Sequence, residues 1–241
     1  MRKISVLMIG NSFSVDAANY THDISLGSDV NIEVCVLYVG GCSLEQHINF
    51  ISNNEAPYEW FINGVSTGRY ISLKEALSYK EYDFITLQQV SVLSGRKDTF
   101  YPYIKDLMNY VKQHQEDPHF VLHETWAYEN GFDNENFSFY KYDRENMYIC
   151  IRNTYEELAN ELGIDITIRS GDVVEAAINH FCEHFHKDGF HLNNEGRYLS
   201  ALTFVRTFDK KPLKTVYVPN EDIFSDRLCK DYEDFVLEVL K

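Results

Sequence analysis

The chain has 241 residues, of which 44% are hydrophobic and 24% charged, so it can bury a sizeable core and its composition does not indicate disorder. Its formal net charge of -15 repels phosphate backbones and anionic lipid surfaces, which argues against nucleic acid or a membrane as a partner. Five scattered cysteines without a C-x-x-C pair indicate reduced thiols, and no stretch approaches the length of a membrane span, so we expect a cytoplasmic protein.

The hydrophobic pattern predicts short buried strands that alternate with helices. The expected strands are apolar, rich in β-branched residues and bounded by turn residues: 4–9, 31–39, 83–87, 119–122 and 164–168. The expected helices have apolar residues at helical spacing or lie between a cap and a glycine: 17–26, 43–50, 72–79, 101–115, 142–162, 173–180, 194–207 and 226–240. The aromatic segment 58–72 contains Asn63-Gly64 and Thr67-Gly68, which favours an inserted β-hairpin.

Strands that alternate with helices form parallel βαβ units. We therefore expect one α/β domain over residues 1–241, built as a three-layer α/β/α sandwich around a mostly parallel five-stranded sheet. The N-terminus superficially resembles a signal peptide, but its apolar run is short and no cleavage site follows, so we interpret it as the first strand.

Four loops that follow expected strands carry polar or small residues. They read GNS after the first strand, GGCS after the second, QQVS after the third and HETW after the fourth. Because the carboxyl ends of parallel strands meet at one edge of the sheet, these loops are expected to lie together.

Ser12 lies where the first strand turns into a helix, close to free backbone N–H groups and the positive end of the helix dipole. That position suits a nucleophile whose reaction develops an oxyanion. It equally suits a helix cap, a role that Asn11, Ser12 or Ser14 could take. The α/β-hydrolase elbow G-x-S-x-G, the Walker A loop and the G-x-G-x-x-G fingerprint are all absent, which argues against nucleotide cofactors.

A serine nucleophile needs a base, and the base needs an orienting partner. The best candidates are Asp188 and His191, three residues apart in DGFH. In a tight turn the carboxylate could hold the Nδ1–H of the imidazole and leave Nε2 to face a hydroxyl. The alternative is a solvated surface turn.

The same region favours a second hypothesis, a metal site. It holds four further candidate ligands, His180, Cys182, His184 and His186, but H-E-x-x-H and paired cysteines are missing. A metal-dependent hydrolase that uses the segment from His180 to His191 therefore stays open as an alternative, although we expect no metal.

Other loop residues could complete a pocket. The backbone N–H of Gly41 could donate to an oxyanion, since a glycine lets the backbone approach a ligand closely. The amide of Gln88 or Gln89 could do the same, or could only satisfy neighbouring backbone groups. Trp126 could offer a flat wall to a sugar or acyl group, or pack in the core.

In their order along the chain, these residues resemble the SGNH (GDSL-like) hydrolases. The blocks are IGNSFSVD, VGGCSL, ITLQQVS and DGFHLNNEGRYL, and the resemblance covers roughly residues 4–208. The nearest likeness is to an uncharacterised branch whose first block reads G-N-S-F-S and whose third reads L-Q-Q-x-S. The resemblance implies a flavodoxin-like fold and a serine esterase without a cofactor, acting on small acyl esters, of which O-acetyl groups on carbohydrates fit best.

The resemblance also implies residue roles. Ser12 would be the nucleophile, His191 the general acid and base, and Asp188 its orienter. The oxyanion would be held by the backbone N–H groups of Ser12 and Gly41 and by a side-chain amide, while Asn11, Trp126 and Phe190 would line the substrate pocket. The chain departs from the family at the third block, where Val90 stands at the position of the usual asparagine, so Gln88 or Gln89 would have to replace that donor. The departure leaves a rival hypothesis open: an α/β ligand-binding protein that has lost turnover.

Overall fold

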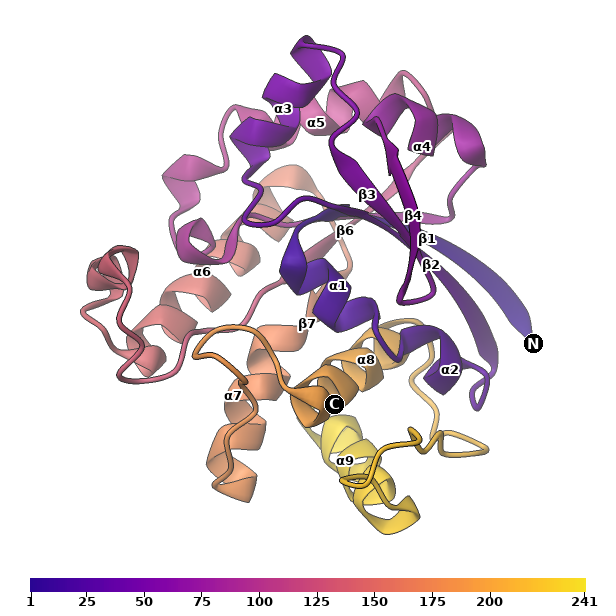
Figure 1. Ribbon diagram of the computed structural model, residues 1–241, viewed down its shortest axis with the longest axis vertical. Coiled ribbons are helices and arrows are strands. Elements are labelled where there is room, and N and C mark those ends of the chain that lie inside the picture. The colour runs from indigo at the N-terminus through magenta and orange to yellow at the C-terminus, as the bar shows by residue number, and fades with distance from the viewer.

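A seven-stranded sheet lies between two layers of helices in the computed structural model, which describes residues 1–241 (Figure 1). The strand order is β4-β3-β2-β1-β5-β6-β7. Five strands run parallel: β1 (Arg2–Gly10), β2 (Val30–Tyr38), β5 (Phe84–Leu87), β6 (His119–Glu124) and β7 (Thr167–Arg169). The expected α/β/α sandwich is therefore confirmed, and its parallel strands follow the flavodoxin-like order.

The predicted hairpin extends this sheet. Its strands are β3 (Tyr58–Ile62) and β4 (Val65–Ile71), and β3 pairs antiparallel with β2, so the whole sheet has seven strands where the parallel part has the expected five. Asn63 and Gly64 form the turn with φ of 50° and 78°. A two-residue hairpin with two positive φ angles is the turn that Asn-Gly favours.

Helices cover both faces. One layer contains α3 (Leu44–Ser52), α4 (Leu73–Tyr79), α5 (Tyr103–Lys112) and α6 (Arg144–Leu162). The other contains α1 (Ser12–Ala18), α2 (Thr21–Ser25), α7 (Ser170–Phe181) and α8 (Asn194–Phe208), with α9 (Asp226–Val239) packed against α8 (Figure 1). Short 3₁₀ turns lie at η1 (Ser91–Leu93), η2 (Lys97–Thr99) and η3 (Glu135–Tyr140). No helix combines the length and the apolar character that crossing a membrane requires.

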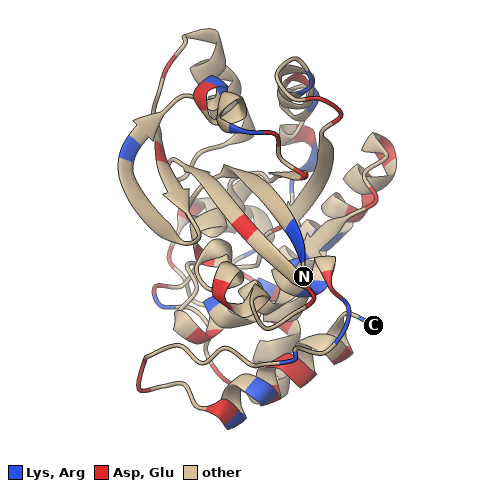
Figure 2. Ribbon diagram, turned by 90° about the vertical axis from the view of Figure 1, so that its right-hand side faces the viewer, with Lys and Arg blue, Asp and Glu red and all other residues tan.

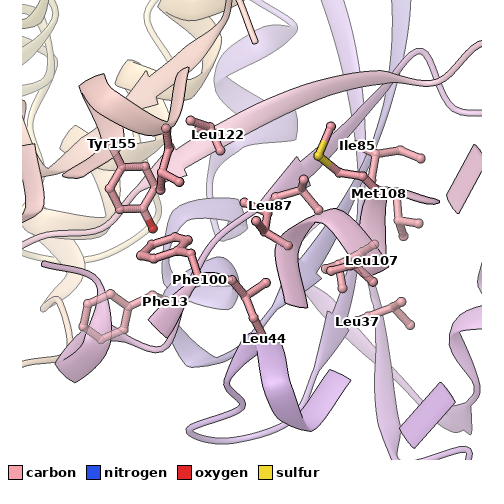
Figure 3. Close-up of a cluster of buried hydrophobic side chains, with 14 of the residues drawn as sticks. Phe13, Leu37, Leu44, Ile85, Leu87, Phe100, Leu107, Met108, Leu122 and Tyr155 are labelled. Atoms are coloured by element: carbon pink, nitrogen blue, oxygen red, sulfur yellow. The ribbon is translucent and has the colours of Figure 1, made fainter. Parts of the chain in front are cut away.

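Alternate residues of β1 face the two layers, which is why its apolar run is continuous. Leu7 and Ile9 belong to the core under α3 to α6, whereas Val6 and Met8 belong to the core under α1, α2 and α8. Figure 3 shows part of the first core. Leu37, Ile85 and Leu87 of the strands face the helical residues Leu44 of α3 and Leu107 and Met108 of α5. Charged residues lie mainly on helices and loops, and fewer lie on the strands (Figure 2).

The first helix differs from its predicted bounds. We expected one helix over 17–26. Instead, α1 begins at Ser12, and the helical structure is interrupted at Asn19 and Tyr20 before α2 begins. Asn11 caps the earlier start, because its side chain accepts the N–H of Phe13. Near the break, the Thr21 hydroxyl donates to the carbonyl of Ala17 at 2.7 Å, a side-chain bond of the kind that competes with a continuous helix.

Candidate active site

The loops after β1, β2 and β5 meet at the carboxyl edge of the sheet around a cavity of about 280 Å³. Residues from five segments line it: Asn11, Ser12, Tyr38, Gly40, Gly41, Val90, Ser91, Tyr128, Phe190 and His191. A larger cavity of about 510 Å³ lies beside β7, α8 and α9, but its lining contains no serine, cysteine or histidine. The smaller cavity is lined by a serine and a histidine whose side chains are hydrogen-bonded to each other, which is the arrangement that nucleophilic chemistry requires.

A hydrogen-bonded chain of three side chains opens onto this cavity. The Oγ of Ser12 lies 2.9 Å from Nε2 of His191, and Nδ1 of His191 lies 2.8 Å from Oδ2 of Asp188. The carboxylate accepts the Nδ1–H, so Nε2 is left to accept the serine proton. In this arrangement a hydroxyl can lose its proton to an oriented imidazole.

The turn from Asp188 to His191 is held by its own backbone and by a neighbouring loop. Oδ1 of Asp188 accepts the backbone N–H of His191 at 2.8 Å, while Oδ2 serves the imidazole. Gly189 has φ +90°, and a Cβ there would lie 2.4 Å from the ring of Phe132. The carbonyl of Gly189 accepts the N–H of Glu129 at 2.8 Å. The loop after β6 therefore stabilises the turn from Asp188 to His191, and only glycine fits at position 189 of this turn.

The environment keeps Asp188 ionised. Partial burial on its own raises the pKa of this carboxyl, but hydrogen bonds from the imidazole and the backbone N–H of His191 outweigh burial and hold the pKa below its usual value. An ionised carboxylate is the form that orients and stabilises an imidazolium.

Asn11 takes the capping role at the start of α1. Its Oδ1 accepts the N–H of Phe13 at 3.1 Å, and its Nδ2 donates to the carbonyl of Cys42 at 3.1 Å. Because Asn11 caps the helix, the hydroxyl of Ser12 is free to face His191. The bond to Cys42 also ties this helix start to the loop that carries Gly41.

Two backbone N–H groups are available beside Ser12. The N–H of Ser12 lies in the first turn of α1, where no intrahelical acceptor exists. The N–H of Gly41 donates to no backbone or side-chain acceptor, and its φ of +63° is one that glycine adopts without strain. Both residues line the cavity, so these donors can serve an oxyanion next to the serine.

Gln88 and Gln89 differ from the expectation that one of their amides faces the cavity. Nε2 of Gln88 donates to Oδ1 of Asn11 at 2.9 Å, and its Oε1 accepts from Ser14 Oγ at 2.8 Å and His123 Nδ1 at 2.6 Å. Both glutamines are buried and neither lines the cavity.

The amide of Gln89 serves the backbone. It accepts the N–H of Leu44 at 3.0 Å and donates to the carbonyl of Thr99 at 3.0 Å. The alternative, that an amide satisfies neighbouring backbone groups, therefore describes Gln89, whereas the amide of Gln88 bonds to three buried side chains.

Trp126 also differs from the expectation that it lines the pocket. It is fully buried and stacks on Phe13 with ring centroids 4.1 Å apart. Its Nε1 donates to the carbonyl of Phe190 at 2.8 Å. Trp126 therefore stabilises the loop that carries Phe190 and His191 from inside the core. Phe190 and Asn11, the other two expected pocket residues, do line the cavity.

The histidine-rich segment does not converge on a metal site. No group of three or more His, Cys, Asp or Glu side chains lies close enough together to hold an ion. His186 faces the carbonyl of Ala127 at 3.0 Å, and His184 faces Glu129 at 3.1 Å on the surface. His186 Nδ1 also lies 3.5 Å from the same carboxylate, but these side chains do not form a cluster that could hold a metal ion, and His191 contacts Ser12 instead.

Several lining residues were not predicted from the sequence. Tyr38 ends β2, Gly40 precedes Gly41, and Ser91 begins η1 in the block QQVS. Tyr128 lies four residues beyond β6. Their positions next to strand ends could have drawn attention to them, but nothing in the sequence distinguishes them from packing residues.

The family of the chain follows from sequence comparison. A family model described as a domain of unknown function, DUF4886, matches residues 5–227. The chain belongs to the DUF4886 family. The crystal structure of a DUF4886 family protein from Bacteroides uniformis is similar with a TM-score of 0.91 and 29% identity, covering 99% of this chain and 95% of that chain. No curated protein sequence matches this DUF4886 protein.

More distant structures share the fold. A protein from Slackia heliotrinireducens, provisionally described as an SGNH hydrolase, matches with a TM-score of 0.61 and 21% identity over 86% of this chain and all of that one. Axe2, an acetylxylan esterase from Geobacillus stearothermophilus, matches with a TM-score of 0.56 and 11% identity over 85% of this chain and 93% of that one. This DUF4886 protein therefore has the α/β fold of SGNH hydrolases.

Proposed function

We propose that this DUF4886 protein is a serine esterase of SGNH type, which hydrolyses small acyl esters through an acyl-enzyme on Ser12. The observation that carries the proposal is the hydrogen-bonded chain from Asp188 through His191 to Ser12 at the mouth of a cavity. A nucleophile, a base and an orienter in contact, beside unused N–H donors, are the parts that acyl transfer requires.

In the proposed reaction, Ser12 Oγ attacks the ester carbonyl while His191 Nε2 takes its proton. The N–H groups of Ser12 and Gly41 hold the oxyanion of the tetrahedral intermediate. The intermediate collapses as His191 returns the proton to the leaving alcohol. A water molecule, deprotonated by the same nitrogen, then attacks the acyl-enzyme and releases the acid and the free serine. No cofactor takes part in these steps.

The cavity favours a small acyl group. Its volume of about 280 Å³ is just below the range of roughly 300–1,000 Å³ for small-molecule sites, and its walls include Tyr38, Tyr128 and Phe190. Aromatic walls with hydroxyl groups suit a sugar as the alcohol part of the ester. We therefore propose O-acetyl groups on a carbohydrate or related metabolite as the natural class, and the acetylxylan esterase among the structural neighbours agrees with this choice.

The test compares hydrolysis of para-nitrophenyl acetate and para-nitrophenyl octanoate by the wild type and two serine variants. Ser12→Ala is expected to lower kcat/KM for acetate by at least about 10³-fold, as losing a nucleophile does in serine hydrolases. Ser72→Ala, which also removes a serine at a helix start but on the exposed cap of α4, is the matched control and should retain wild-type kcat/KM. A preference for octanoate would contradict the small acyl class.

Two rival functions have distinct results in the same assay. A ligand-binding protein without turnover predicts no hydrolysis of any ester and no covalent labelling of Ser12 by an organophosphonate. A metal-dependent hydrolase predicts activity that survives Ser12→Ala and disappears with a chelator. We expect labelling of Ser12 and full activity in the presence of EDTA.

A further inference from the structure

Two hydroxyl groups lie opposite each other in the cavity wall. The Oγ of Ser91 and the Oη of Tyr128 are 2.8 Å apart, and both residues line the cavity. Ser91 is 6% exposed and Tyr128 is 4% exposed, so both side chains are largely enclosed by protein beside the cavity. The ring of Tyr128 is fixed by edge contacts with Phe132, Phe137 and Phe190.

A count of protons shows that this pair has a donor left over. Two hydroxyls carry two protons, and the hydrogen bond between them uses one. No other protein group is hydrogen-bonded to Ser91 Oγ or to Tyr128 Oη. A buried donor without an acceptor costs free energy, so the remaining O–H is suited to an acceptor that a ligand brings.

Ser91 and the nucleophile belong to loops that follow neighbouring strands and line the same cavity. Ser91 follows β5, and β5 pairs directly with β1, whose last residue stands two positions before Ser12. The loops after these two strands share the cavity. The amides of Gln88 and Gln89, also on the β5 loop, are both engaged inside the protein. Ser91 is therefore the side-chain donor of that loop that faces the cavity.

We propose that Ser91 Oγ donates a hydrogen bond to the carbonyl oxygen of the bound ester, and that Tyr128 Oη strengthens this bond by donating to Ser91. The proposal rests on the proposed esterase function and names the third oxyanion donor, beside the N–H groups of Ser12 and Gly41. Tyr128 is the positioning residue, because it acts through Ser91.

The direction of the hydrogen bond, with tyrosine as donor and serine as acceptor, follows from the acidity of the two hydroxyl groups. A phenol is a stronger acid than an alkanol, so it is the better donor within the pair, and a hydroxyl that accepts one hydrogen bond donates the next more strongly. Burial raises the pKa of Tyr128 to about 12, which keeps the phenol protonated at neutral pH.

The experiment measures kcat and KM for para-nitrophenyl acetate in Ser91→Ala, Ser91→Thr and Tyr128→Phe. Ser91→Ala is expected to lower kcat by about 10²- to 10³-fold with little change in KM, as for a lost oxyanion donor. Ser91→Thr keeps the hydroxyl and should stay within about threefold of the wild type. Tyr128→Phe removes one neutral hydrogen bond and should lower kcat by about 3- to 10-fold. Ser72→Ala and Tyr103→Phe, both at exposed hydroxyls away from the cavity, are the controls.

A second readout separates transition-state stabilisation from a structural role. A small alkylboronic acid forms a tetrahedral adduct with a reactive serine and mimics the intermediate, whereas acetate mimics the product. In Ser91→Ala the inhibition constant of the boronic acid should rise by the same factor by which kcat/KM falls, and that of acetate should stay constant. Thermal unfolding is followed for every variant, and Ser91→Cys, with its weaker donor, replaces Ser91→Ala if that variant does not fold.

Three results would overturn the inference while the esterase function stands. One is a kcat of Ser91→Ala within threefold of the wild type, although Ser12→Ala is inactive. Another is a loss confined to KM, which means that Ser91 only binds substrate. The third is a loss that depends on the alcohol of the ester, which would place Ser91 against the leaving group. Failure of the wild type to hydrolyse esters, together with no labelling of Ser12, would instead contradict the esterase proposal itself.

Discussion

The side-chain amide of Gln88 donates to Oδ1 of Asn11 at 2.9 Å, and Asn11 is the residue directly before Ser12. The other end of the same amide accepts from Ser14 and His123, so Gln88 links β5, α1 and β6 beneath the cavity. Burial lowers the pKa of His123 to about 3, and the neutral ring can therefore donate its Nδ1–H to the amide oxygen. Gln88 thus positions the helix start that carries Ser12, without reaching the cavity.

This role predicts that Gln88→Leu has a larger effect on the free energy of unfolding than on kcat. The change leaves the hydroxyl of Ser14 and the Nδ1–H of His123 without an acceptor, at a cost of about 1–3 kcal/mol for each buried group. We expect the free energy of unfolding in urea to fall by about 2–4 kcal/mol and kcat to fall less than tenfold, because Asn11 keeps its bonds to Phe13 and Cys42. Gln113→Leu, at the end of α5, is the control. A large loss of kcat at unchanged stability would mean that the amide acts on the oxyanion after all.

Much of the fold could be predicted because its signals are local. The parallel strands are short apolar runs bounded by turns, and the edge where loops meet follows from strand direction alone. The start of α1 was missed because Asn11, Ser12 and Ser14 are equally good caps in sequence, and only the bond to Phe13 selects Asn11.

Side-chain orientation at the site could not be predicted in the same way. Whether Gln88 faces the cavity depends on Ser14 and His123, which come from other elements, and whether Trp126 is a wall or a core residue depends on Phe13. The pairing of Ser91 with Tyr128 joins residues 37 positions apart, which no periodicity reveals.

The backbone at Gly41 can be tested with a matched pair of glycines. Gly41 and Gly68 have φ of +63° and +69°, and a Cβ at either would meet nothing within 4 Å. Alanine at each position should therefore cost only the left-handed strain, about 1–2 kcal/mol in the free energy of unfolding. Alanine keeps the backbone N–H, so Gly41→Ala can affect catalysis only if the backbone shifts to relieve the left-handed strain. Because this N–H belongs to the cavity wall, we expect such a shift to lower kcat by about tenfold, while Gly68→Ala in the exposed hairpin should leave kcat unchanged. Equal kcat values for the two variants would show that catalysis does not depend on the backbone geometry at Gly41.

Asp188→Asn tests the orientation of the base. The carbonyl oxygen of asparagine can still accept the backbone N–H of His191, so the turn should fold, but its NH₂ group would face Nδ1 of the imidazole. This favours the tautomer with the proton on Nε2, which cannot accept the proton of Ser12. We expect kcat to fall by about 10²- to 10⁴-fold at an unchanged melting temperature, with the exposed Asp98→Asn as control. A kcat within threefold of the wild type would show that His191 is oriented without the carboxylate.

Glu124, at the end of β6, predicts a dependence of stability on pH. Burial first, and then the negative charge of Asp172, raise the pKa of Glu124 to about 8. The unfolded chain releases this proton near pH 4.5, so between about pH 4.5 and pH 8 the folded state binds one proton more than the unfolded state. The stability contributed by the protonated form is fully present below that window and is lost as the pH rises through it, by about 1.4 kcal/mol per pH unit at most.

Replacing the carboxyl of Glu124 with an amide should remove this dependence. The oxygen of Glu124→Gln can still accept the N–H of Asp172, which lies 2.9 Å from Oε1 in the wild type. Measured by urea unfolding at pH 5.5 and pH 7.5, the wild type should lose about 1–3 kcal/mol more than Glu124→Gln over this interval. Glu116→Gln, at an exposed position, should follow the wild type. Parallel curves for all three proteins would mean that Glu124 is ionised in the folded state, and that its charge is balanced by Arg169 beside Asp172.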